Sequence, residues 1–210
     1  MNGKNKDEAV ITNFIYADKF KYDEKKRNKI RKQLKIASSD IVLGNVGGFT
    51  EIKNQKFIIE MISKMPSQYK AVIVGGGPLR NSLENAIEQY DVRSRVTLID
   101  NVSDIENYYN AFDYFLLPSL GEGLPFVSVE AQCNGLLNIL SDNVPKSTKI
   151  TDKVVFLKLD SNFWAQYIMN CRLSDKKERA SGYQAIEKAG FTDKTAPNEI
   201  IKKLKEIAYE

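Results

Sequence analysis

Apolar and polar positions follow two patterns that take turns along this chain. The first is a short, almost continuous apolar run, which predicts a strand buried on both faces. Such runs occur at 40–46, 69–74, 95–99, 113–117, 136–140 and 154–159. The second pattern repeats apolar residues every three or four positions, which predicts a helix. It occurs at 23–34, 54–64, 79–90, 104–112, 125–134, 161–172, 175–189 and 197–208.

This alternation of strands and helices predicts a Rossmann-like α/β fold, in which a parallel sheet of about six strands carries helices on both faces. The chain of 210 residues is long enough for one domain with a sizeable core. We expect the polar residues 1–9 to form a mobile segment and residues 10–210 to form the domain. The helix over 23–34 is strongly charged, so we expect it to lie on the surface.

The most unusual segment is Ser119–Glu130, which follows the apolar run at 113–117. It holds Glu122 in a Gly-rich turn and Glu130 eight positions later in an apolar run. Pro125 can begin the next helix because its fixed φ suits a first helical turn. Glu122 would then lie at the carboxyl end of a strand and Glu130 on the inner face of the helix, where open α/β sheets bind ligands. The free N–H groups of a helix start suit an anion, and a carboxylate beside them can accept hydrogen bonds from sugar hydroxyls.

This spacing resembles the Glu-x7-Glu motif of the retaining glycosyltransferases of family 4, which are GT-B enzymes with two Rossmann-like domains. Other segments resemble the C-terminal, donor-binding domain of that family in the same order, over roughly residues 10–160. They are Val10–Asn13 with Asp18–Phe20, Val46–Phe49 with Glu51–Asn54, Val74–Pro78, and Ser141–Asp142 with Val144–Pro145. The resemblance implies a domain that binds a nucleotide-diphosphate sugar, with UDP as the expected nucleotide. It also implies a reaction that needs neither a metal ion nor a cofactor.

The resemblance implies roles for the residues around the Gly-rich turn. Glu130 would accept hydrogen bonds from the ribose hydroxyls, and Glu122 from hydroxyls of the donor sugar. The backbone N–H groups around Gly123 and Leu124 would meet the diphosphate or the sugar. The alternative for the two glutamates is a structural role, with Glu130 bonded to nearby backbone.

A cation near the diphosphate is the second part of the implied site. Lys53 matches a family lysine that neutralises the diphosphate as the glycosidic bond breaks, so Lys53 and Glu122 are the candidate catalytic residues. An arginine that shares this task in the family is replaced here by Gly48. The loss of one such cation is expected to cost about 2–4 kcal/mol of transition-state stabilisation. Arg80 is a candidate substitute, and the alternative for Lys53 is an ordinary surface lysine.

Two further loops border the implied site. The loop Gly75–Pro78 lies near the donor in the family, which makes Gly76 a candidate contact. A tight strand-to-helix turn explains this loop equally well, and its spacing is not that of a dinucleotide fingerprint. Val102, after the third strand, would border the nucleotide base.

The chain contains no histidine, which excludes a His-based triad, a His metal site and a His general base within this polypeptide. In the resembling family a histidine lies with the acceptor site in the N-terminal domain. We therefore expect that acceptor domain to be missing from this chain or to be a separate subunit, and the chain alone to be incomplete for catalysis. Cys133 and Cys171 are too few for a disulfide framework or a metal site.

Charge and hydropathy limit the partners and the location. The formal net charge is +4, and lysines concentrate at 19–35, 176–177 and 202–205. These clusters suit acidic lipid or a phosphorylated substrate, and the alternative is a set of solvated helix faces. No zinc-finger spacing or RNP-like aromatic motif occurs, so no nucleic-acid partner is expected. No apolar run is long enough to cross a membrane, so the expected location is the cytoplasm, including peripheral contact with the inner face of the membrane.

These observations favour the donor-binding half of a retaining glycosyltransferase that transfers a glycosyl group to a hydroxyl acceptor, as in bacterial capsular or other surface polysaccharide synthesis. Two alternatives remain open. One is a non-catalytic module that binds a nucleotide sugar or regulates another protein, which Gly48 would suit, and the other is one subunit of a split glycosyltransferase. A sugar-nucleotide epimerase of similar fold is disfavoured by the absence of histidine and by the Glu-x7-Glu spacing.

Overall fold

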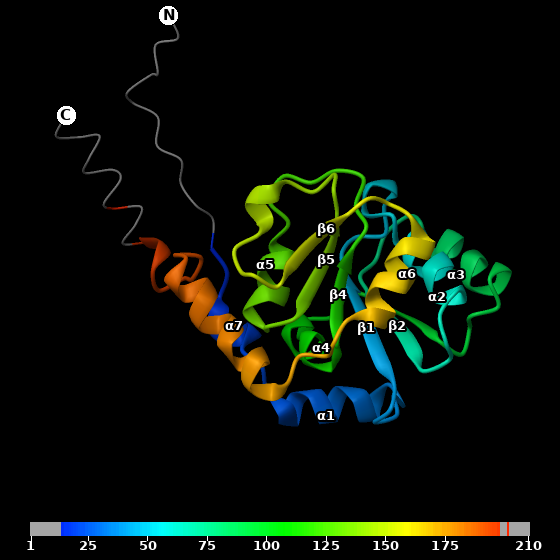
Figure 1. Ribbon diagram of the computed structural model, residues 1–210, viewed down its shortest axis with the longest axis horizontal. Coiled ribbons are helices and arrows are strands. Elements are labelled where there is room, and N and C mark those ends of the chain that lie inside the picture. Colours follow the sequence, from blue (N-terminus) through cyan, green and yellow to red (C-terminus); the bar gives the residue numbers. More distant parts are fainter. Residues whose placement is uncertain (1–13, 198–200, 202–210) are drawn as a thin grey trace, which may run out of the picture.

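The computed structural model describes residues 14–197 and Ile201 (Figure 1). The predicted mobile segment 1–9, the segment Val10–Asn13 and nearly all of the helix predicted over 197–208 lie outside the described residues. The other predicted strands and helices fall within them.

The predicted Rossmann-like α/β fold is confirmed. All six strands are parallel, and their order in the sheet is β3-β2-β1-β4-β5-β6 (Figure 1). The strands are β1 (Ile41–Val46), β2 (Tyr69–Val74), β3 (Val96–Ile99), β4 (Tyr114–Leu117), β5 (Leu137–Ser141) and β6 (Val154–Leu157). The order along the chain reverses between β1 and β4, which is the position where open α/β sheets bind ligands.

Helices cover both faces of the sheet, as the alternating pattern predicts (Figure 1). The first face carries α1 (Glu24–Gln33), α4 (Ile105–Ala111), α5 (Phe126–Cys133), α7 (Lys176–Lys188) and the 3-10 helix η1 (Ala17–Phe20). The second face carries α2 (Gln55–Ser63), α3 (Arg80–Gln89) and α6 (Ser161–Asn170). The short 3-10 helices η2 (Glu51–Lys53) and η3 (Lys146–Thr148) lie in connecting loops.

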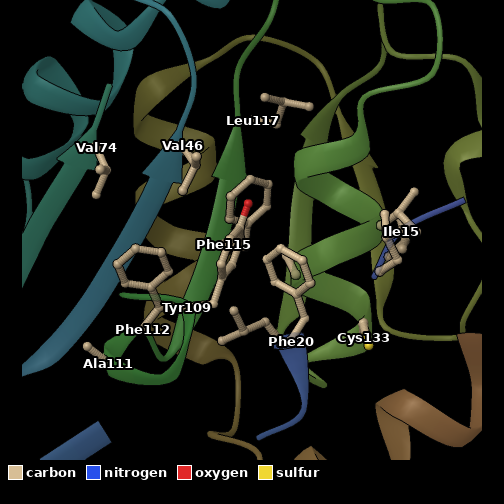
Figure 2. Close-up of a cluster of buried hydrophobic side chains, with 14 of the residues drawn as sticks. Ile15, Phe20, Val46, Val74, Tyr109, Ala111, Phe112, Phe115, Leu117 and Cys133 are labelled. Carbon is tan, nitrogen blue, oxygen red and sulfur yellow. The ribbon is translucent and has the colours of Figure 1, made fainter. Parts of the chain in front are cut away.

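Strand side chains alternate between two hydrophobic cores, one on each face. Val42 of β1 belongs to the core under α4 and α5, whereas Leu43 belongs to the core under α2 and α3. In the first core, the ring of Tyr109 packs edge-to-face against Phe20 and Phe112, with ring centroids 5.5 and 5.8 Å apart (Figure 2). These aromatic contacts fix α4 against η1 and the sheet.

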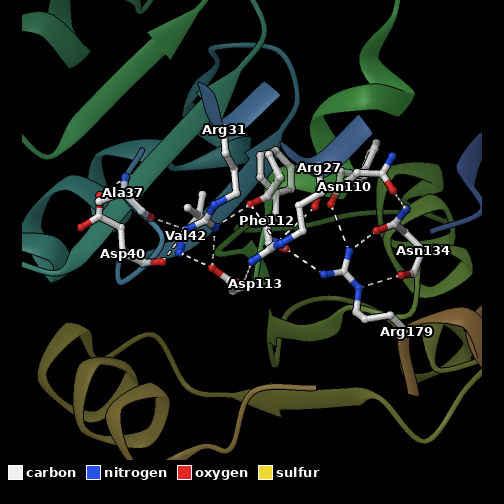
Figure 3. A network of polar contacts seen from close by, with 12 residues as sticks. Arg27, Arg31, Ala37, Asp40, Val42, Asn110, Phe112, Asp113, Asn134 and Arg179 are labelled. Carbon is white, nitrogen blue, oxygen red and sulfur yellow. Dashed lines mark hydrogen bonds and ion pairs between the residues drawn. The ribbon is translucent and has the colours of Figure 1, made fainter. Parts of the chain in front are cut away.

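The charged helix at 23–34 lies on the surface, as predicted, and one side of it packs against the fold. Ile30 and Arg31 of α1 are buried. Arg27 and Arg31 both bind the carboxylate of Asp113, with N–O distances of 2.6 and 3.1 Å, just before β4 (Figure 3). A charged helix can pack against the fold here because its arginines have a buried partner.

Arg179 of α7 is another buried cation at this amino-terminal edge of the sheet. Its guanidinium donates hydrogen bonds to the backbone carbonyls of Phe112 (2.9 Å), Asn134 (2.9 Å) and Tyr109 (3.2 Å) (Figure 3). Burial lowers the pKa of Arg179 to about 9. The three carbonyl partners join α7 to the ends of α4 and α5.

The helix α5 begins at Phe126, one residue later than predicted. Pro125 is its N-cap, with extended backbone (φ −75°, ψ 101°), so the proline precedes the first turn instead of occupying it. The Ser128 N–H donates to the Pro125 carbonyl at 3.0 Å. The Gly-rich turn therefore leads directly into the amino end of this helix.

Candidate functional site

The loops that follow β1 and β4 lie against each other at the carboxyl edge of the sheet. The Leu120 N–H donates to the Ile52 carbonyl at 2.8 Å, and the Asn54 side-chain amide donates to the Pro118 carbonyl at 3.1 Å. β1 and β4 are neighbours at the point where the strand order reverses. The two loops therefore form one surface at the switch point of the sheet.

The two candidate catalytic residues meet on this surface. The Lys53 ammonium lies 2.7 Å from Glu122 Oε1, although the residues are 69 positions apart in the sequence. Their side chains are 24% and 11% exposed, so the ion pair is partly withdrawn from water. Lys53 therefore lies beside the other candidate catalytic residue, and its role in a site stays a prediction.

Ser119 is a site residue that the sequence analysis does not identify. Its hydroxyl donates to the same Glu122 Oε1 at 2.7 Å, and its side chain is fully buried. No hydrogen bond to Glu122 Oε2 is found within residues 14–197. One oxygen of this carboxylate is therefore held in place while the other is available to a ligand.

The Gly-rich loop after β2 is a tight turn fitted against the loop after β1. A Cβ on Gly75 would lie 2.0 Å from the Gly47 carbonyl oxygen, and a Cβ on Gly77 would lie 2.7 Å from the Phe49 carbonyl oxygen. The Phe49 N–H donates to the carbonyl of Gly76 at 2.8 Å. These close approaches account for the glycines by packing. A contact between Gly76 and a ligand stays a prediction.

Gly48 leaves open space where the resembling family has an arginine. A Cβ there would meet only the Gly76 carbonyl oxygen at 3.7 Å and a Thr50 methyl at 3.9 Å, which are ordinary contacts. Arg80, the candidate substitute, instead forms ion pairs with Asp100 and, at 3.6 Å, with Glu84. Because both of these partners are carboxylates, the charge of Arg80 is already balanced locally.

Glu130 lies on α5 at the edge of a cavity of about 330 Å³. Aromatic and polar side chains from η1 and the residues before it, from α4 and the loop before it, and from the start of α5 share this cavity; they include Phe14, Tyr16, Lys19, Ser103, Glu106 and Phe126. The Tyr109 hydroxyl donates to Glu130 Oε2 at 2.6 Å. Burial raises the pKa of Glu130, the Tyr109 hydrogen bond opposes this, and the charge of Glu106 raises it further.

The remaining predicted residues take different positions around the site. Gly123 is exposed, with no atom within 4 Å of where its Cβ would be, so a ligand can approach its backbone closely. Leu124 is half-buried in the turn that precedes α5. Val102 is partly buried against the first hydrophobic core. A contact of Val102 with a base stays a prediction.

Within residues 14–197, no cluster of three or more His, Cys, Asp or Glu side chains is arranged to hold a metal ion. No helix among the described residues is long and apolar enough to span a membrane.

Comparison with known proteins places this arrangement in a family. The sequence profile described as "Glycosyl transferases group 1" matches residues 26–160, which is more than half of the chain. The chain belongs to the group 1 glycosyl transferases. The matched region of this glycosyl transferase contains Lys53, Glu122 and Glu130.

Two curated relatives and one solved structure illustrate the similarity. The putative glycosyltransferase EpsF of Bacillus subtilis is 29% identical over 162 residues, covering 74% of this chain and 42% of EpsF. The UDP-Gal:alpha-D-GlcNAc-diphosphoundecaprenol alpha-1,3-galactosyltransferase of Escherichia coli is 34% identical over 142 residues, covering 64% of this chain and 36% of that protein. The crystal structure of HepE of Anabaena in complex with UDP has a TM-score of 0.81 at 21% identity, covering 94% of this chain and 57% of HepE.

These coverages show that the chain spans less than half the length of both curated relatives. The likeness to HepE confirms the fold, a Rossmann-like α/β domain. The family match and the fold together correspond to the C-terminal domain of such enzymes.

Proposed function

We propose that this chain is the donor-binding half of a retaining glycosyltransferase, and that it binds a nucleotide-diphosphate sugar whose glycosyl group is transferred to a hydroxyl acceptor. The observation that carries the proposal is the meeting of Lys53 and Glu122 at the switch point, with Glu130 lining a cavity on the helix that follows. Such a site suits a diphosphate flanked by two sugars, because the cation can bind the diphosphate and each carboxylate can bind one sugar.

Each part of the donor has a partner in this proposal. The ammonium of Lys53 neutralises the diphosphate, on which charge develops as the glycosidic bond breaks. The available Oε2 of Glu122 accepts hydrogen bonds from the donor sugar, and the exposed backbone at Gly123 approaches the diphosphate. Glu130 accepts hydrogen bonds from the ribose, whose neighbouring hydroxyls a carboxylate can bind together. The proposed reaction uses no metal ion, and Lys53 together with the backbone N–H groups around Gly123 meets the diphosphate instead.

The names of similar proteins support UDP as the nucleotide. HepE has been crystallised with UDP and with UDP-glucose, and the name of the Escherichia coli relative specifies a UDP-galactose donor and a lipid-linked diphosphate acceptor. Other relatives carry names from O-antigen and teichuronic acid biosynthesis. We therefore propose bacterial surface polysaccharide synthesis as the setting of the reaction.

A non-catalytic nucleotide-sugar-binding module is the second candidate. Gly48 favours it, because Lys53 then faces the diphosphate without the family's arginine and is already paired with Glu122. The two candidates differ in the expected rate of sugar transfer and agree on binding, so a binding experiment tests the site common to both.

Glu130→Gln is expected to weaken binding of UDP by about 1–3 kcal/mol, because a charged hydrogen-bond partner of the ribose is lost. Calorimetric titration with UDP measures the change. The matched control is Glu106→Gln, which removes a carboxylate from the same cavity without touching the proposed ribose contact. Equal affinity of wild type and Glu130→Gln for UDP would contradict the assignment.

Gly48→Arg is expected to strengthen binding of a UDP-sugar by about 1.5–3 kcal/mol, the usual range for a hydrogen bond to a charged group. A Cβ on residue 48 fits without a clash, because its nearest neighbour would lie 3.7 Å away. Gly48→Ala is the control, since it adds the Cβ without the charge and should leave affinity unchanged. If Gly48→Arg stays folded and binds no better, the diphosphate does not lie beside residue 48.

A further inference from the structure

The hydroxyl of Tyr109 is held rigidly against Glu130. The Tyr109 side chain is fully buried, and its ring packs against Phe20, Phe112 and Phe115 at centroid distances of 5.5, 5.8 and 5.9 Å (Figure 2). Its hydroxyl donates to Glu130 Oε2 at 2.6 Å. Because three aromatic neighbours fix the ring, the position of the hydroxyl is set by the core and not by the ligand.

Few other groups stabilise the charged form of Glu130. Within residues 14–197, no lysine or arginine lies within ion-pair distance of its carboxylate, and Tyr109 is its one hydrogen-bonding side chain. The charged or titratable groups that face it are Glu106 from α4, Lys19 from η1 across the cavity, and Cys133 on its own helix. A partly desolvated carboxylate without a cation depends on its hydrogen-bond donor.

Burial raises the pKa of Tyr109 well above its usual value, and the adjacent Glu130 raises it further. The phenol therefore remains protonated at physiological pH and acts as a donor throughout. It uses one lone pair of Glu130 Oε2, which leaves lone pairs on both carboxylate oxygens for a ligand.

We propose that Tyr109 is a positioning residue for ribose recognition: its hydroxyl keeps the Glu130 carboxylate charged and oriented toward the two neighbouring hydroxyls of the nucleotide's ribose. This inference rests on the proposed function, because it assigns the ribose to Glu130. Tyr109 belongs to the hydrophobic core and touches no ligand itself, yet it would help to determine the affinity for ribonucleotides.

The inference predicts a change in pH dependence. The Tyr109 hydrogen bond lowers the pKa of Glu130, whereas burial and Glu106 raise it. Removal of the Tyr109 hydroxyl should therefore raise the pKa of Glu130 further. Since the charged carboxylate binds the ribose, affinity for UDP should then be lost at a higher pH as the solution is acidified.

The experiment is a calorimetric titration of the full chain with UDP and with 2′-deoxy-UDP at several pH values, for wild type, Tyr109→Phe and the control Tyr108→Phe. Tyr108 lies on the same helix and is only partly buried, so its variant removes a comparable hydroxyl elsewhere. We expect Tyr109→Phe to bind UDP about tenfold more weakly, as for a lost charge-assisted hydrogen bond. The pH at which acidification halves the affinity for UDP (the pH midpoint) should shift upward. Binding of 2′-deoxy-UDP, which keeps only one of the two hydroxyls, should weaken less than binding of UDP, and Tyr108→Phe should resemble wild type.

Several outcomes would overturn the inference. Equal losses for UDP and 2′-deoxy-UDP, without a shift in the pH midpoint, would indicate a merely structural role for Tyr109. A full additional loss when Tyr109→Phe is combined with Glu130→Gln would show that the tyrosine does not act through Glu130. If wild type binds UDP and Tyr109→Phe binds it equally, this inference fails while the proposed function stands. If wild type binds no UDP, both fail together.

Discussion

Lys53→Met is expected to weaken binding of a UDP-sugar by about 2–5 kcal/mol, the range found when one member of a close charge pair is removed from a binding site. Two effects contribute. The diphosphate loses its cation, and Glu122 is left as an unpaired carboxylate beside a dianionic group, because the 2.7 Å contact with Lys53 is gone. The measurement is calorimetric titration with UDP-glucose, and Lys56→Met, an exposed lysine on α2, is the control.

The same ion pair predicts an effect of opposite sign for Glu122→Gln. Without its carboxylate partner, Lys53 is free to bind the diphosphate, so UDP should bind more tightly than to wild type. The extra affinity for UDP-glucose over UDP should fall, because the sugar loses a charged acceptor. In the double variant Lys53→Met with Glu122→Gln, affinity for UDP should exceed that of Lys53→Met alone. If Glu122→Gln changes UDP affinity by the same factor with and without Lys53, the two side chains do not act on the diphosphate together.

Asp113→Asn is expected to lower the free energy of unfolding by about 3–5 kcal/mol, because removing one member of a buried ion pair leaves uncompensated buried charge. The Asp113 carboxylate accepts hydrogen bonds from Arg27 (2.6 Å), Arg31 (3.1 Å) and the Val42 N–H (2.7 Å). The side chains of Asp113 and Arg31 are both only 8% exposed. Urea denaturation, followed by circular dichroism, measures the change.

Asp18→Asn provides the matched comparison for Asp113→Asn. Asp18 also binds two cations, Lys21 and Lys194, each at 2.5 Å, but its side chain is 48% exposed. Exposed ion pairs contribute about 0–1 kcal/mol, so Asp18→Asn should cost far less than Asp113→Asn. Similar losses for the two variants would show that burial of the Asp113 network does not control its contribution to stability.

The apolar runs of the sequence predict the four central strands well because these strands are almost entirely buried, whereas the edge strands β3 and β6 are only partly buried. The run at 40–46, for example, contains β1 (Ile41–Val46), whose residues after Ile41 are all buried. The sequence is less informative for α1, where Arg27 and Arg31 look like solvent-facing charges. Their burial depends on Asp113, which is more than 80 positions away and whose proximity no local period encodes.

The sequence identifies the residues of the candidate site one at a time, but it does not predict the contacts between them. Motif spacing identifies Lys53 and Glu122 separately, but their ion pair exists because β1 and β4 are neighbours in the sheet. Tyr109 lies in a helix whose pattern predicts packing, and only the fold brings its hydroxyl to Glu130. Ser119 begins the segment that holds both glutamates, but motif spacing does not show that its hydroxyl bonds to Glu122.

The most direct test of the central claim is a titration of the isotope-labelled chain with UDP-glucose, in the presence of EDTA, followed by backbone-amide NMR. The account predicts saturable shifts in the turn at 119–125, at the start of α5, and in the loops after β1 and β3, without any added metal ion. Lys53→Met should need a much higher UDP-glucose concentration for the same shifts. Shifts confined to the opposite edge of the sheet, around Asp113 and Arg179, or no shifts at all, would contradict a donor site at the carboxyl ends of the strands.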